Sequence, residues 1–183
     1  MKAAVITRDY RLEIWDVPIP EPGDYEVLCR TTYGATCAGT DLRLMRGGHP
    51  NPVSYPAILG HESVGRVVAV GNKVKNFKEG DLITRVGAPP IPQMGLGVCW
   101  GGFSEYSIAK DHWEMRREGR DRALFEKNRV NQVDWRGVEE RDAPLIITLR
   151  ETLSYFKRLH ITRGSNLLVI GSGANSLAFA QYG

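Results

Sequence analysis

Short apolar runs separated by turns dominate residues 1–110 of the chain. Runs rich in β-branched residues predict strands, of which the clearest span residues 3–7, 27–32, 63–70 and 81–86. Glycine and proline separate these runs, for example at Pro22-Gly23, Gly47-Gly48 and Gly71. Strands this short, interrupted about every ten residues, predict a β-barrel or a β-sandwich.

The pattern changes after residue 110. Residues 111–141 are highly charged and lack alternation, and we expect a helix there only around Asp121–Asn128. Residues 144–159 place apolar side chains on one helix face, at positions 145, 149, 153 and 156, with Pro144 in the first turn. This segment therefore predicts a helix packed through its leucines.

The apolar run Asn166–Ile170 (NLLVI) predicts a strand buried on both faces of a parallel sheet. A glycine-rich turn follows it, and a helix is expected over Ser176–Tyr182. A parallel strand needs neighbouring strands. We therefore expect a chain truncated at Gly183, or a sheet whose remaining strands come from elsewhere.

Composition narrows the class of protein. The 183 residues are 42% hydrophobic and 25% charged, which suits a soluble globular domain with a piece of a second one. No apolar run approaches the roughly 18 residues of a membrane span, so no membrane partner is predicted. The basic stretch Arg116–Arg129 is interspersed with acidic residues, so no nucleic-acid partner is predicted. Three cysteines are too few for a disulfide framework and favour a cytoplasmic location.

One cluster carries candidate chemistry. His61 and Glu62 stand in the segment Gly60–Gly65 (GHESVG), and Cys37 lies upstream in the segment 35–41 (ATCAGTD). Imidazole, thiolate and carboxylate can supply three zinc ligands and leave a fourth position open, as in catalytic zinc sites. The residues alone also allow a second interpretation, in which Cys37 is a small buried side chain and His61 a hydrogen-bonded loop histidine.

The surrounding pattern resembles a known family. The segment Gly60–Val74 is similar to the signature of zinc-dependent medium-chain alcohol or polyol dehydrogenases. That signature reads G-H-E-x-x-G, then five residues, then G-x-x-V. Met1–Val5, Gly39–Leu42 and Gly101–Tyr106 resemble further segments of that family.

The resemblance implies a mostly β chain. A GroES-like, irregular β-barrel catalytic domain is expected in residues 1–158, followed by the first β-α unit of a Rossmann domain in residues 159–183. For the full-length protein, it implies a homo-oligomer that oxidises a small-molecule secondary alcohol, polyol or sugar reversibly with NAD or NADP.

The resemblance also assigns roles to residues of the cluster. Cys37 and His61 match zinc ligands, and Glu62 matches a glutamate that binds the metal in some relatives and lies behind it in others. Thr40 matches the hydroxyl residue that takes the substrate proton. Asp41 matches the carboxylate that receives the other N–H of the zinc-bound histidine.

The chain departs from the family pattern around the ligands. Ala38 is an additional residue between Cys37 and Gly39. Where relatives supply a third ligand, this chain has Ile146 and Ile147, which cannot bind zinc. We therefore predict Glu62 as the third ligand and Glu151, one turn further along the helix, as an outer contact to water or substrate.

The metal count follows from the remaining cysteines. Many relatives hold a structural zinc with four closely spaced cysteines, but the matching region here contains Cys99 alone. One catalytic zinc and no structural zinc are expected, and Cys99 is expected to be packed in the interior.

The glycine-rich turn after the apolar run predicts a dinucleotide site. Gly171, Gly173, Ala174 and Asn175 are the candidate contacts of the cofactor pyrophosphate, at the N-terminus of the following helix. The acidic residue that separates NAD from NADP is expected beyond Gly183, so the two cofactors are not distinguished.

Two other functions remain open from sequence. One is a zinc-free, quinone-reductase-like member of the same superfamily. The other is a non-catalytic GroES-like module that binds a metal or a partner.

Overall fold

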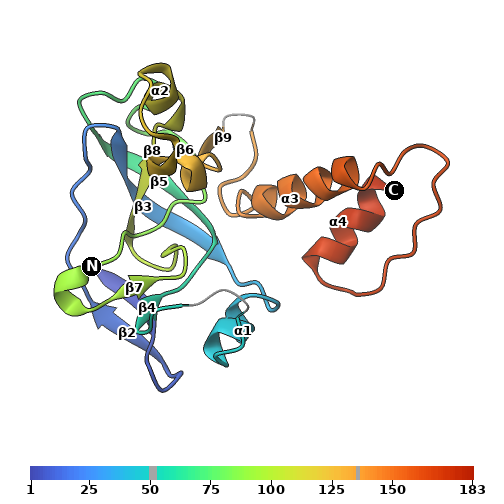
Figure 1. Ribbon diagram of the computed structural model, residues 1–183, viewed down its shortest axis with the longest axis horizontal. Coiled ribbons are helices and arrows are strands. Elements are labelled where there is room, and N and C mark those ends of the chain that lie inside the picture. The colour runs from blue at the N-terminus through green and yellow to red at the C-terminus, as the bar shows by residue number, and fades with distance from the viewer. Residues whose placement is uncertain (50–52, 135–136) are drawn as a thin grey trace. The chain divides into compact units, whose positions relative to one another are not determined.

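The computed structural model describes residues 1–49, 53–134 and 137–183. Two compact units are formed, Met1–Pro144 and Leu145–Gly183 (Figure 1). Every strand of the described chain lies in the first unit, and the second unit contains two helices. None of the described helices is long and apolar enough to cross a membrane.

The described residues of the first unit form two β-sheets. The four-stranded sheet has the order β2-β1-β4-β7, with β1 Lys2–Ile6, β2 Leu12–Asp16, β4 Ala57–Ile58 and β7 Gly97–Val98. The five-stranded sheet has the order β8-β3-β5-β6-β9, with β3 Glu26–Ala35, β5 Glu62–Val70, β6 Leu82–Thr84, β8 Tyr106–Lys110 and β9 Gln132–Asp134. This mostly β architecture confirms the predicted fold class.

Short helices connect and cover these sheets. The α-helices of the first unit are α1 Asp41–Met45 and α2 His112–Arg117. The part of this unit that the structure describes also has the 3-10 turns η1 Pro92–Met94, η2 Arg122–Leu124 and η3 Glu126–Asn128. The sequence pattern missed α2, although Asp111 marks its start by accepting a hydrogen bond from the Glu114 backbone N–H at 3.1 Å.

The antiparallel pair β3 and β5 forms the middle of the larger sheet. Its register runs from Val27 opposite Val70 to Ala35 opposite Glu62. Buried side chains beneath it form the main apolar core: Val27, Cys29, Val67, Val74, Phe77, Ile83, Val86 and Ala109. The register brings the end of β3 beside the beginning of β5, and the candidate site lies at that junction.

The glycines of the signature are required by close backbone crossings. Gly60 has φ +101°, and a Cβ there would lie 2.5 Å from the Phe103 backbone nitrogen. A Cβ at Gly65 would lie 2.9 Å from a carbonyl oxygen, and one at Gly71 would lie 2.7 Å from another. Val74 is buried in the main core. These four positions therefore serve the fold of the barrel.

The helix predicted around Asp121–Asn128 is replaced by the 3-10 turns η2 and η3. Asp121 caps the first turn by accepting a hydrogen bond from the Ala123 N–H at 2.9 Å. Phe125 then leaves helical geometry at φ −135° and buries its ring with Tyr25 and Met115. Burial of this one aromatic side chain interrupts the expected helix.

The second unit pairs α3 Leu145–Arg158 with α4 Ala174–Tyr182. Phe156 stacks on Phe179 with ring centroids 5.4 Å apart. The predicted helix α3 is confirmed, but its predicted apolar face is only partly confirmed: Phe156 is buried and Leu149 is half-buried. Leu145 and Leu153 are 50% and 40% exposed, and the buried positions are Ile147, Thr148, Thr152 and Phe156. Thr152 is accommodated because its hydroxyl donates to the Thr148 carbonyl at 2.9 Å.

The predicted strand Asn166–Ile170 is not formed. The segment has no regular structure, and Leu168 and Ile170 are 83% and 87% exposed. The second unit contains no other strand that could accept its backbone hydrogen bonds, which explains the difference. The division into a catalytic domain at 1–158 and a Rossmann segment at 159–183 stays a prediction.

Replacing Gly71 with alanine should lower the free energy of unfolding by roughly 1–3 kcal/mol, the range for overpacked sites. A Cβ at Gly71 meets backbone atoms that cannot move independently. The matched control is Gly48→Ala, whose Cβ would make only an ordinary contact at 3.9 Å. Urea midpoints measure both variants, and equal midpoints would contradict this role of Gly71.

Candidate metal centre

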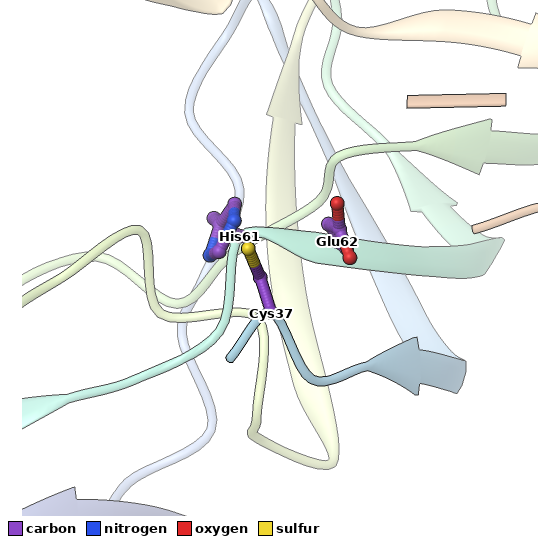
Figure 2. A group of neighbouring side chains, drawn as sticks. All are labelled: Cys37, His61 and Glu62. Atoms are coloured by element: carbon purple, nitrogen blue, oxygen red, sulfur yellow. The ribbon is translucent and has the colours of Figure 1, made fainter. Parts of the chain in front are cut away.

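Strand pairing places the three predicted metal ligands together. The β3–β5 register ends at Ala35 opposite Glu62. Cys37, just beyond β3, therefore meets His61, just before β5. The ligand atoms of Cys37, His61 and Glu62 all lie within 4.8 Å of one another, and His61 is buried (Figure 2). Among the described residues, no other group of His, Cys, Asp or Glu is arranged to hold a metal ion.

The spacing of these atoms suits zinc. Zinc bonds of about 2.3 Å to sulfur and about 2.0–2.2 Å to nitrogen or oxygen place tetrahedral ligand atoms roughly 3.3–3.8 Å apart. The ligand atoms are separated by at most 4.8 Å, which is close to that spacing. Thiolate, imidazole and carboxylate are all donors that zinc accepts.

Asp41 joins the two segments that carry these side chains. Its Oδ2 accepts a hydrogen bond from the Cys37 backbone N–H at 2.8 Å. Its Oδ1 lies 3.4 Å from Nδ1 of His61, and both residues are buried. Neither Oδ1 nor Nδ1 has a hydrogen-bond partner among the described residues. A proton on Nδ1 would satisfy both atoms and leave the other ring nitrogen as a metal ligand.

The additional residue Ala38 does not separate Cys37 from its neighbours. The Cys37 carbonyl accepts hydrogen bonds from the backbone N–H groups of Thr40, at 3.1 Å, and Asp41, at 2.8 Å. The Cys37 thiol donates to the Thr40 hydroxyl at 3.8 Å. A tight turn thus absorbs the insertion, and Thr40 is half-buried next to the cluster.

Two residues beside His61 were not predicted from sequence. Arg85 donates from Nε to the His61 carbonyl at 3.1 Å, and the Trp100 ring centroid lies 5.2 Å from that of His61. Both have positive φ, 58° and 68°, a region that non-glycine residues rarely adopt. The sequence offers no signal for such a conformation in arginine or tryptophan.

The other two cysteines are interior side chains. Burial raises the pKa of Cys29 to about 12. Burial, with the nearby charge of Asp41, raises the pKa of Cys99 to about 11. Cys99 is 4% exposed, as expected for a packed residue. Both thiols are therefore neutral near pH 7, and neither belongs to the group of potential metal ligands found among the described residues.

The remaining predicted site residues lie in the second unit. Glu151 is exposed on α3, and its place relative to the cluster stays a prediction. Gly171 has φ +139°, and a Cβ there would collide with the Ser176 side chain. Gly173 caps α4, whose first two residues are Ala174 and Asn175, and this turn is exposed.

A separate hollow lies on the strands of the first unit. It has a volume of about 340 Å³ and is lined mainly by residues of β1 and β3 and by the segment 102–105. None of the three predicted metal ligands lines it. The candidate chemistry therefore rests on the side-chain cluster at the β3–β5 junction.

Sequence comparison finds relatives over the part of the chain that carries the cluster. A family model described as the alcohol dehydrogenase GroES-like domain matches residues 23–117. Acryloyl-coenzyme A reductase of Sulfurisphaera tokodaii is 42% identical over 86 residues, which are 45% of this chain and 25% of that protein. An alcohol dehydrogenase of Cupriavidus necator is 37% identical over 83 residues, 45% of this chain and 22% of that protein.

Solved structures resemble the whole chain. Acetophenone reductase from Geotrichum candidum, in complex with NAD, matches 99% of this chain and 54% of its own, at 27% identity and a TM-score of 0.74. Galactitol-1-phosphate dehydrogenase from Escherichia coli has the same TM-score at 24% identity, a likeness of fold, over 52% of its chain. The chain thus spans about half the length of these structures.

The family match includes Cys37, Thr40, Asp41, His61 and Glu62 and covers just over half of the 183 residues. The similar solved structures include one from Sinorhizobium meliloti, described as a putative zinc-binding dehydrogenase bound to NADP, at 23% identity, a likeness of fold. By this match and by its fold, the chain belongs to the alcohol dehydrogenase GroES-like domain family, as the signature implied.

Proposed function

We propose that this chain supplies the zinc site of an NAD(P)-dependent oxidoreductase. The whole protein would interconvert a secondary alcohol, polyol or sugar with its carbonyl compound, as a cytoplasmic homo-oligomer. The observation that carries the proposal is the convergence of Cys37, His61 and Glu62 within 4.8 Å. This convergence favours the zinc-dependent function over a zinc-free relative, which has no use for three adjacent donors.

The proposed ligands are Cys37, His61 and Glu62, with one zinc and no structural zinc. Asp41 orients His61 through Nδ1, so that the ring presents its other nitrogen. Glu62 follows His61 directly in the chain, so its recruitment needs no movement of a remote segment. Glu151 is proposed as an outer contact to water or to a substrate hydroxyl.

Oxidation of an alcohol removes a proton and a hydride. Zinc supplies a Lewis acid for the substrate oxygen, and NAD or NADP supplies the hydride acceptor. The Thr40 hydroxyl is proposed to accept the substrate proton, because it lies 3.8 Å from the Cys37 sulfur. Thr40 is half-buried, so the proton can continue from its hydroxyl to solvent.

The cofactor contacts are proposed at the turn Gly171–Asn175. Open space surrounds the Cα of Gly173, where a Cβ would meet no atom within 4 Å. The first backbone N–H groups of α4, including those of Ala174 and Asn175, have no partner inside the helix and are suited to a phosphate. On this assignment, residues 159–183 belong to the cofactor-binding domain.

Zinc content tests the ligand assignment. The wild-type chain should hold close to one zinc, and Cys37→Ser should hold almost none while remaining folded. Glu62→Ala should weaken zinc binding about tenfold or more, the scale of lost contacts around a metal. Glu151→Ala is the matched control, because it removes the same carboxylate from an exposed helix position and should leave zinc in place.

Competition with a chromophoric chelator gives the affinities, and circular dichroism checks folding. If zinc is lost in Glu151→Ala but retained in Glu62→Ala, the third ligand is Glu151 and the assignment of Glu62 is wrong. Unchanged zinc in Cys37→Ser would remove Cys37 from the site.

Turnover by the whole protein tests the role of Thr40. Thr40→Val should retain zinc but lower kcat for alcohol oxidation roughly a hundredfold or more, the contribution of general acid–base catalysis. Thr40→Ser should restore most of the rate. Thr36→Val is the control, because Thr36 is exposed in the same loop. Full activity in Thr40→Val would exclude this proton path, and absence of zinc-dependent oxidation in the wild type would refute the proposed function.

A further inference from the structure

Trp100 is held in place by the backbone on both sides of it. The Cys99 N–H donates to the Ile58 carbonyl at 2.7 Å, and the Gly102 N–H donates to the Gly60 carbonyl at 2.8 Å. Residues 99–102 therefore run alongside the segment that leads into His61. Trp100 adopts φ 68° within this pinned stretch, so its backbone conformation is fixed by its surroundings.

The indole of Trp100 is partly open to solvent and also contacts a proposed metal ligand. Its ring centroid lies 5.2 Å from that of His61, with the planes inclined at 46°. Trp100 is 45% exposed, whereas His61 is 6% exposed. The indole thus packs beside the imidazole, and nearly half of the Trp100 surface is open to solvent.

Such an aromatic surface has a definite chemical preference. Indole binds flat groups with apolar C–H surfaces and gains less from an open chain of hydroxyl groups, which must give up their hydration. A substrate oxygen held at the cluster brings the substituents of its carbon near Trp100, because the indole adjoins His61 directly.

We propose that Trp100 is a specificity-determining residue for the reaction of this site. It favours substrates whose alcohol carbon belongs to, or carries, a ring with a flat apolar face, over open-chain polyols. The inference rests on the proposed function, because it takes the metal at Cys37, His61 and Glu62 as the point that holds the substrate oxygen.

Two hydroxamates that differ only in a ring test this preference without turnover. Benzohydroxamate and acetohydroxamate share one metal-binding group, and only the first carries a ring. Each is titrated into the chain loaded with cobalt(II), whose visible spectrum reports binding at the metal. The measured quantity is the ratio of the two dissociation constants, which cancels any change in the metal itself.

Trp100→Ala should reduce the preference for benzohydroxamate about tenfold, the scale of one aromatic contact. It should leave acetohydroxamate binding nearly unchanged. Trp100→Phe should retain part of the preference, because it keeps an aromatic face. The matched control is Trp113→Ala, which removes an indole of similar exposure from α2. Helix α2 lies at the opposite end of the first unit from α1, which begins at Asp41 beside the proposed metal ligands (Figure 1).

The outcomes distinguish failure of the proposed metal site from failure of the specificity role of Trp100. If cobalt binds and the ratio is unchanged in Trp100→Ala, Trp100 only shields His61 and the specificity proposal fails, while the metal site stands. If the ratio falls equally in Trp113→Ala, the preference does not arise at Trp100. If the folded wild-type chain binds no cobalt, the proposed function and this inference fail together. Unchanged acetohydroxamate binding shows that the Trp100 variants keep the metal site intact.

Kinetics of the whole protein then distinguish a preference for an aryl ring from a preference for a saturated ring. Trp100→Ala should lower kcat/KM for 1-phenylethanol and cyclohexanol about tenfold relative to 2-butanol and sorbitol. A fall for 1-phenylethanol alone identifies an aryl group as the preferred ring, and a fall for cyclohexanol alone identifies a saturated one. Equal effects on sorbitol and the cyclic alcohols would overturn the proposal.

Discussion

The carboxylate of Asp41 lies between the Cys37 turn and the ring of His61. One oxygen accepts the Cys37 backbone N–H at 2.8 Å, and the other lies 3.4 Å from Nδ1 of His61. Both Asp41 and His61 are buried, so an unmatched charge or an unpaired N–H there would be costly. The proposed site depends on this pair, because a proton on Nδ1 would join the His61 ring to the carboxylate that already accepts the Cys37 N–H.

The larger sheet sets the coarse position of that pair. The register of β3 and β5 brings Ala35 opposite Glu62, which leaves Cys37 and His61 side by side at the end of the ladder. The glycines of the signature permit the crossings that hold this end of the sheet, since a Cβ at Gly60 would meet the Phe103 backbone at 2.5 Å. The signature thus combines backbone requirements with two chemical side chains, His61 and Glu62.

Elements that depend on the local residue pattern could be predicted from the sequence. The runs rich in β-branched residues at 27–32 and 63–70 lie within β3 and β5, and the spacing of the signature residues in Gly60–Val74 indicated the family. Elements that depend on contacts between residues far apart in the sequence were predicted wrongly. The exposed run Asn166–Ile170 lacks partner strands within its unit, and Phe125 interrupts the expected helix through burial. The left-handed conformation of Trp100 arises from backbone pairing of its neighbours, which no single-chain pattern reports.

At the β3–β5 junction, one metal ion is proposed to be bound by one sulfur and two lighter donors. X-ray absorption spectroscopy of the zinc-loaded chain tests this most directly, because it counts sulfur separately from nitrogen and oxygen. We expect one sulfur at about 2.3 Å, with the remaining neighbours being nitrogen or oxygen at about 2.0–2.2 Å. A spectrum with two or more sulfur neighbours, or with none, would contradict it.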